Sequence, residues 1–79
     1  MPAATIPRID TRGLKCPWPV LRAARAMRIH AEILLLADDP VARTDLPALA
    51  EANGWTLSLR HGDTHDEYSF SRADSNTAS

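Results

Sequence analysis

The sequence predicts an α+β domain of two layers, in which two helices cover one face of a sheet. Apolar residues recur at the helical period in residues 16–29 and 44–53, which predicts two helices. They form an unbroken run in residues 32–37 and alternate with polar residues in 55–60 and 67–72, which predicts three strands. With a short extended start, the segments in order are residues 6–11, 16–29, 32–37, 44–53, 55–60 and 67–72. The order is therefore β-α-β-α-β-β. A strand–helix–strand unit crosses over right-handed, so we expect the first two strands to be parallel.

Length and composition indicate a single soluble domain spanning residues 1–79. The chain has 44% apolar and 24% charged residues, which is ordinary for a globular protein. Its longest apolar run, Ile33 to Ala37, is too short for a membrane span. The start lacks the features of a secretory signal, and one cysteine makes no internal disulfide, so we expect a cytoplasmic protein with no membrane partner. Residues 73–79 are small and polar, typical of a disordered tail.

The first strand and the first helix are separated by a turn. Pro7 favours an edge position for the strand at residues 6–11, and Arg12-Gly13 is a turn signal. The helix at residues 16–29 has an apolar stripe formed by Val20, Leu21, Ala24 and Met27. On the opposite side lie three arginines at a spacing of three, namely Arg22, Arg25 and Arg28.

The second helix follows a break at Asp38-Asp39-Pro40. We expect Thr44 or Asp45 to cap it and Pro47 to fall in its first turn, where a missing N–H costs little. Its apolar stripe is formed by Leu46, Leu49 and Ala50. Gly54 suits the left-handed position that ends a helix.

The last two strands are close enough along the chain to pair as a hairpin with a loose six-residue loop. Trp55 begins the first of them and is expected to lie in the core. The outward positions of both strands are polar, namely Thr56, Ser58, Glu67 and Ser69. This pattern predicts that both helices cover one face of the sheet and water the other.

Cys16 is the one cysteine, and it lies in a rigid segment between Lys15 and Pro19. In one register Cys16 is the N-cap, Pro17 is the first helical residue, and the Trp18 N–H can reach the sulfur. In the other, the helix starts at Pro19 and Trp18 lies outside it. Both registers put the sulfur near the positive end of a helix.

Two positive side chains lie close to this cysteine along the chain, Lys15 beside it and Arg12 one turn of chain away. The helix end and these charges both favour a thiolate. We therefore expect Cys16 to ionise readily near neutral pH. Arg12, Gly13, Lys15, Pro17 and Pro19 are the expected supporting residues.

Several kinds of thiol chemistry are excluded by the residues around Cys16. A dithiol cycle needs a second cysteine, and a cysteine hydrolase needs a histidine that local spacing does not supply. His61 and His65 share no face in a loop, and three glycines form no phosphate loop, so we expect neither a metal nor a cofactor. The chemistry that remains is a thiolate that accepts a sulfane sulfur as a persulfide, which a partner thiol then removes.

Two separated motifs resemble those of the TusA/SirA-like sulfur carriers. The first is Asp10-x-x-Gly13-Leu14-x-Cys16-Pro17-x-Pro19, and the second combines Ala37-Asp38-Asp39-Pro40 with Asp45-Leu46-Pro47. The resemblance covers residues 9–72 and implies a mixed four-stranded sheet. It also implies that Cys16 takes sulfur from a cysteine desulfurase or another donor and passes it to an acceptor protein. The family serves tRNA thiolation, molybdenum cofactor and sulfur oxidation routes, as a carrier rather than a stand-alone enzyme. The link at residues 27–32 is shorter than usual in that family.

The charges are unevenly distributed along the chain. Residues 1–36 hold six basic and two acidic side chains, and residues 37–79 hold three basic and eight acidic ones. The three arginines of the first helix either dock an acidic partner or form a solvated face, and Trp18 either anchors a partner or covers the core. Asp38, Asp39 and Asp45 either orient the loop that bears the cysteine or cap the second helix, with capping favoured for Asp45.

The alternative function is a regulatory module that docks through the Cys-Pro-Trp-Pro turn without any chemistry at the sulfur. A nucleic-acid binder is disfavoured because the second half of the chain is acidic. A carrier that must visit several partners in turn is most simply a monomer.

Overall fold

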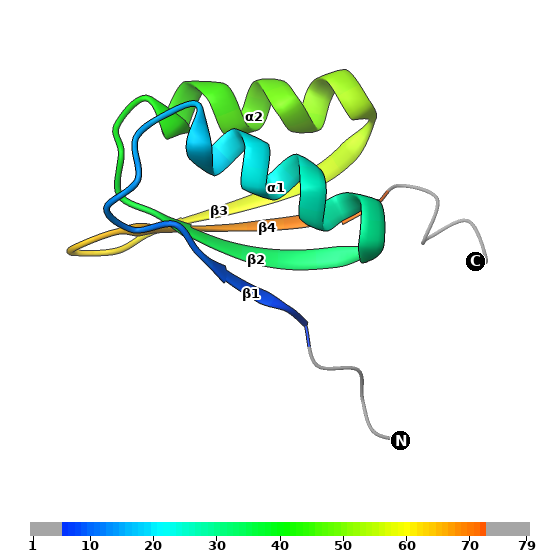
Figure 1. Cartoon of the computed structure of the whole chain (residues 1–79), viewed down its shortest axis with the longest axis horizontal. Helices are drawn as coiled ribbons and strands as arrows, with labels where there is room; N and C mark the ends of the chain where they lie inside the picture. Colours follow the sequence, from blue (N-terminus) through cyan, green and yellow to red (C-terminus); the bar gives the residue numbers. More distant parts are fainter. Residues whose placement is uncertain (1–5, 73–79) are drawn as a thin grey trace.

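The computed structural model describes residues 6–72, and its helices and strands follow the predicted order (Figure 1). They are β1 (Arg8–Asp10), α1 (Trp18–Ile29), β2 (Glu32–Ala37), α2 (Ala42–Asn53), β3 (Trp55–His61) and β4 (Asp66–Arg72). The frayed start expected before residue 6 and the tail expected after residue 72 lie outside the described residues.

The four strands form one mixed sheet in the order β1-β2-β4-β3. β1 is parallel to β2, β2 is antiparallel to β4, and β3 and β4 form an antiparallel hairpin. Both helices lie over the same face of this sheet (Figure 1). The two-layer α+β prediction is therefore confirmed. Because β1 and β2 are parallel, their carboxyl ends meet at one edge, and the loops that follow them lead to the starts of α1 and α2.

The core lies between the sheet and the helices. Its largest fully buried apolar side chains are Tyr68, Phe70, Met27, Ile33, Leu35, Leu36 and Leu46. The predicted stripe of α1 is partly wrong, because Leu21 is 51% exposed and the buried positions are Pro19, Ala23, Ala26 and Met27. Three alanines in α1 fit either face, so periodicity alone did not fix the rotation of this helix.

Both helices begin at residues other than those predicted. α1 starts at Trp18 with Pro17 as its N-cap, which lies between the two registers considered. α2 starts at Ala42, so Thr44 and Asp45 lie inside the helix and do not cap it, and Pro47 falls past the first turn. The Asp39 carboxylate instead accepts the Val41 N–H at 3.1 Å. The first turn of α2 is therefore held by a residue that precedes its N-cap.

The turns of the second half follow the sequence more closely. Gly54 adopts φ 71° at the end of α2, as predicted for a left-handed position. The hairpin loop is shorter than expected, because β3 extends to His61 and β4 begins at Asp66. The compressed link between α1 and β2 is accommodated by two residues, His30 and Ala31.

Asp66 is a buried acid at the start of β4, on the face covered by the helices. Its carboxylate accepts hydrogen bonds from Arg43 Nε of α2 at 2.8 Å and contacts His61 Nδ1 at 3.1 Å. The Tyr68 hydroxyl lies 3.5 Å away. The hydrogen bond from Arg43 is the main cause that lowers the pKa of Asp66 below its usual range. The charged carboxylate therefore joins α2 to the hairpin.

An Asp66→Asn variant is expected to lose about 1.5–3 kcal/mol of unfolding free energy at pH 7, the usual loss for hydrogen bonds to a charged group. Because the folded-state pKa of Asp66 is lowered, its charge stabilises the fold above the unfolded pKa of about 3.9 and stops doing so as pH falls through the folded value. The difference in unfolding free energy between wild type and Asp66→Asn should thus become smaller in acid. Urea unfolding at several pH values measures it, with exposed Asp63→Asn as the control; a difference that persists in acid would contradict it.

Candidate functional site

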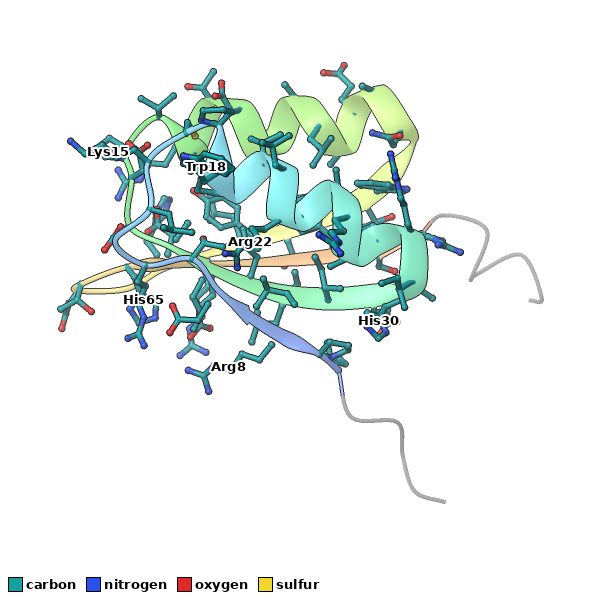
Figure 2. The ribbon with its side chains drawn as sticks, in the orientation of Figure 1. Arg8, Lys15, Trp18, Arg22, His30 and His65 are labelled. Atoms are coloured by element: carbon teal, nitrogen blue, oxygen red, sulfur yellow. The ribbon has the colours of Figure 1, made fainter. Side chains whose placement is uncertain are left out.

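Cys16 lines a shallow groove of about 550 Å³ at the end of the molecule where both helices begin. One wall is the β1–α1 loop from Gly13 to Cys16, and the other is the β2–α2 turn from Asp38 to Val41. Figure 2 shows Lys15 and Trp18 at this end and His30 at the far end of α1. The sulfur-bearing residue is half-buried and packs against the core from one side. The groove leaves it accessible from the other.

A series of hydrogen bonds fastens the β1–α1 loop to the end of β2. The buried Thr11 donates its N–H and its hydroxyl to the Leu36 carbonyl, at 2.8 and 2.5 Å. The Asp38 carboxylate then accepts the Gly13 N–H with both oxygens, at 3.0 and 3.1 Å. The backbone pairing of β1 and β2 is thus continued beyond the strands by hydrogen bonds to two side chains, those of Asp38 and Asp39.

The Asp39 carboxylate accepts the backbone N–H of Cys16 at 2.7 Å. Gly13 permits the turn before this contact because it adopts φ 85°, a conformation that other residues rarely take. The Cys16–Pro17 peptide bond is cis. The Trp18 N–H donates to the Lys15 carbonyl at 2.9 Å, so the prediction that this donor reaches the sulfur is wrong.

The electrostatic environment of the sulfur is the reverse of the one predicted. Burial raises the pKa of the Cys16 thiol to about 11, and a hydrogen bond to Asp45 and the negative charges of Asp39 and Asp45 act in the same direction. Arg12 instead pairs with Asp10 at 2.8 Å, and Lys15 helps to lower the pKa of Asp39. The free protein therefore holds Cys16 as a thiol at neutral pH, mainly because the residue is partly buried and also because two carboxylates distant in sequence lie near the sulfur.

The residues proposed for partner contact fall into two groups. Trp18 is 56% exposed beside the groove, and Arg22, Arg25 and Arg28 are exposed along α1. Asp39 and Asp45 belong to the sulfur site itself, whereas Asp38 holds the neighbouring Gly13 and does not act on the sulfur. Sequence reasoning missed Val41, a 51% exposed apolar residue in the groove wall, and Tyr68, the β4 residue whose hydroxyl interacts electrostatically with Cys16. The alternation of β4 marked Tyr68 as inward-facing but not as a neighbour of the sulfur.

The histidines lie in other surroundings. His61 contacts Asp66, and the His65 ring contacts the Thr64 hydroxyl at 3.0 Å. Within residues 6–72, no group of three or more histidine, cysteine, aspartate or glutamate residues is arranged to hold a metal ion. In the same part of the chain, neither twelve-residue helix has the length and hydropathy of a bilayer-spanning segment.

The chain is similar to known proteins in both sequence and structure. Residues 8–71 match the family described as Sulfurtransferase TusA. A protein of Archaeoglobus fulgidus described as "Putative sulfur carrier protein" is 43% identical over 53 residues, which cover 63% of this chain and 69% of that protein. The crystal structure of the SirA-like protein from Desulfitobacterium hafniense superposes with a TM-score of 0.76 and 28% identity, over 84% of this chain and 96% of that one.

Proposed function

Because the chain belongs to the TusA sulfurtransferase family, we propose that it is a sulfur carrier that accepts sulfur as a persulfide on Cys16 and passes it to an acceptor protein. The observation that carries this proposal is the position of Cys16. It is the one cysteine of the chain, and it lines an open groove on a loop that Asp38 and Asp39 fasten to the sheet.

The chemistry of the site suits a relay rather than a complete reaction. In the accepting step, Cys16 Sγ forms a bond to the outer sulfur of a donor persulfide, and the sulfur–sulfur bond of the donor breaks. The departing donor thiolate takes the proton that Cys16 loses, so no external oxidant or reductant is needed. In the delivering step, an acceptor thiol attacks the outer sulfur of the Cys16 persulfide, the sulfur–sulfur bond breaks, and Cys16 is released as a thiol. The lack of a resolving cysteine favours a persulfide that lasts until the acceptor arrives.

The raised pKa of Cys16 supports a carrier that reacts only when a partner is bound. At neutral pH the thiol is protonated, so it is a poor nucleophile toward small molecules in solution. A cysteine desulfurase or another persulfide-bearing protein is the proposed donor. The acceptor is a downstream protein with a reactive cysteine, in a route such as tRNA thiolation, molybdenum cofactor assembly or sulfur oxidation.

Exposed side chains beside the groove supply a surface for these partners. Trp18 at the start of α1 and Val41 in the groove wall offer exposed apolar area near Cys16, and the three arginines of α1 add positive charge along one helix face. An acidic partner surface is the proposed complement of that face. We propose a monomer in the cytoplasm, where a lone thiol is kept reduced.

The proposal is tested by incubating the protein with a cysteine desulfurase and cysteine, followed by intact-mass analysis. We expect an increase equal to the mass of one sulfur atom, which a reducing thiol removes. Protein whose Cys16 has first been alkylated is the control and should gain nothing. If the native protein stays at its original mass while the desulfurase turns over, the proposed function is wrong.

A further inference from the structure

Asp39 connects Cys16 to the start of α2 through one carboxylate. Its Oδ2 accepts the Cys16 N–H at 2.7 Å, and its Oδ1 accepts the Val41 N–H at the start of α2 at 3.1 Å. Both carboxylate oxygens of the neighbouring Asp38 accept the Gly13 N–H, and neither accepts a hydrogen bond from Cys16. Asp39 is thus the acidic residue whose bond fixes the backbone at the sulfur.

The same hydrogen bonds keep Asp39 charged. The bond from the Cys16 N–H is the main cause that lowers the pKa of Asp39, and the bond from Val41 adds to it. A negative charge therefore stays beside the sulfur throughout the physiological pH range. Other groups that face the sulfur are Asp45 on α2 and Tyr68 on β4. Burial raises the pKa of Tyr68 to about 12, so this hydroxyl is neutral at neutral pH.

We propose that Asp39 is a positioning residue for sulfur transfer, which fixes the Cys16 backbone against the start of α2 and places a negative charge beside the sulfur. This inference rests on the proposed function for its biological meaning, although its physical content concerns Cys16 alone. A sulfur held in place but protonated is protected from oxidation and from premature transfer. In the transfer step Asp39 forms and breaks no covalent bond.

The test measures the rate at which iodoacetamide alkylates Cys16 in the full chain as a function of pH. Asp39→Asn removes the charge and keeps one of the two side-chain oxygens that accept hydrogen bonds. We expect the midpoint of the rate profile to fall by about one pH unit, the effect of losing one nearby like charge. Asp38→Asn is the matched control, because Asp38 is equally acidic and adjacent but bonds to Gly13; its midpoint should stay within about 0.3 units of wild type.

Asp39→Glu separates charge from position. It keeps the carboxylate but lengthens the side chain, so the high midpoint should be retained while sulfur acceptance from a desulfurase slows. A purely structural role would leave the midpoint of Asp39→Asn unchanged, and that result, or an equal shift in Asp38→Asn, overturns the proposal.

Wild-type protein provides a further test that needs no variant to fold. Its alkylation rate should still rise with pH at pH 9.5, whereas a plateau near the free-cysteine value of about 8.5 overturns the proposal. Alkylation uses no sulfur donor, so a failure to form the persulfide would leave this result standing, and the two proposals can fail separately.

Discussion

A Cys16→Ser variant is expected to accept no sulfur from a donor that loads the wild-type protein. Serine presents an oxygen where the persulfide sulfur must attach, and the chain has no other cysteine to replace it. Asp39 bonds to the backbone N–H of residue 16, so this contact survives the substitution. The loss should therefore be confined to chemistry: intact-mass analysis should show no adduct, and thermal unfolding should show a Tm close to wild type.

An adduct on Cys16→Ser equal to that on wild type would contradict the assignment of the sulfur-accepting residue. The alternative of a docking module makes a different prediction for cells. In that case Cys16→Ala would keep full activity, and Trp18→Ala, which removes an exposed ring beside the groove, would lose it. In the carrier, Cys16→Ala abolishes activity, and Trp18→Ala still becomes loaded when the donor is present in excess.

Local patterns were sufficient for most of the fold. The alternation of Trp55 to Arg60 marks a strand with Trp55 and Leu57 on its inward face, where both are partly buried against the core, because residue spacing alone decides which side chains share a face. Gly54 could be placed because few other residues tolerate its positive φ. The parallel pairing of β1 and β2 followed from the handedness of the crossover. Each of these inferences depends on neighbours in sequence or on a general rule of chain geometry.

The ionisation state of Cys16 could not be predicted from such local patterns. Lys15 and Arg12 are its neighbours in sequence, and they predicted a thiolate. Burial is the main cause that raises the pKa of Cys16, and the negative charges that add to it come from Asp39 and Asp45, which the fold brings to Cys16 from beyond β2. The start of α2 was misplaced for a similar reason, because Asp39 accepts the N–H of Val41 in place of a local cap. Side chains that act across the fold require the register of the strands, which the sequence pattern does not contain.

A Phe70→Ala variant is expected to lose about 3–5 kcal/mol of unfolding free energy, the usual loss for a buried phenylalanine. Phe70 is 1% exposed on β4, between Ile33 of β2 and Leu57 of β3. Its ring meets the Trp55 ring edge-on, with centroids 6.2 Å apart. A domain of this size is stabilised by only about 0.05–0.15 kcal/mol per residue, so the loss is a large part of the total.

The expected result is a fall in Tm of at least about 15 °C, measured by circular dichroism. Ser69→Ala is the matched control, because Ser69 is adjacent but exposed on the outer face, and its change should stay within about 0.5 kcal/mol. Because β4 pairs with β2, which ends at Ala37 directly before Asp38 and Asp39, loosening this contact also releases the loop that holds Cys16. Alkylation of Cys16 should therefore accelerate in Phe70→Ala at temperatures below its Tm. A stable variant with wild-type alkylation would mean that the sulfur site does not depend on this part of the core.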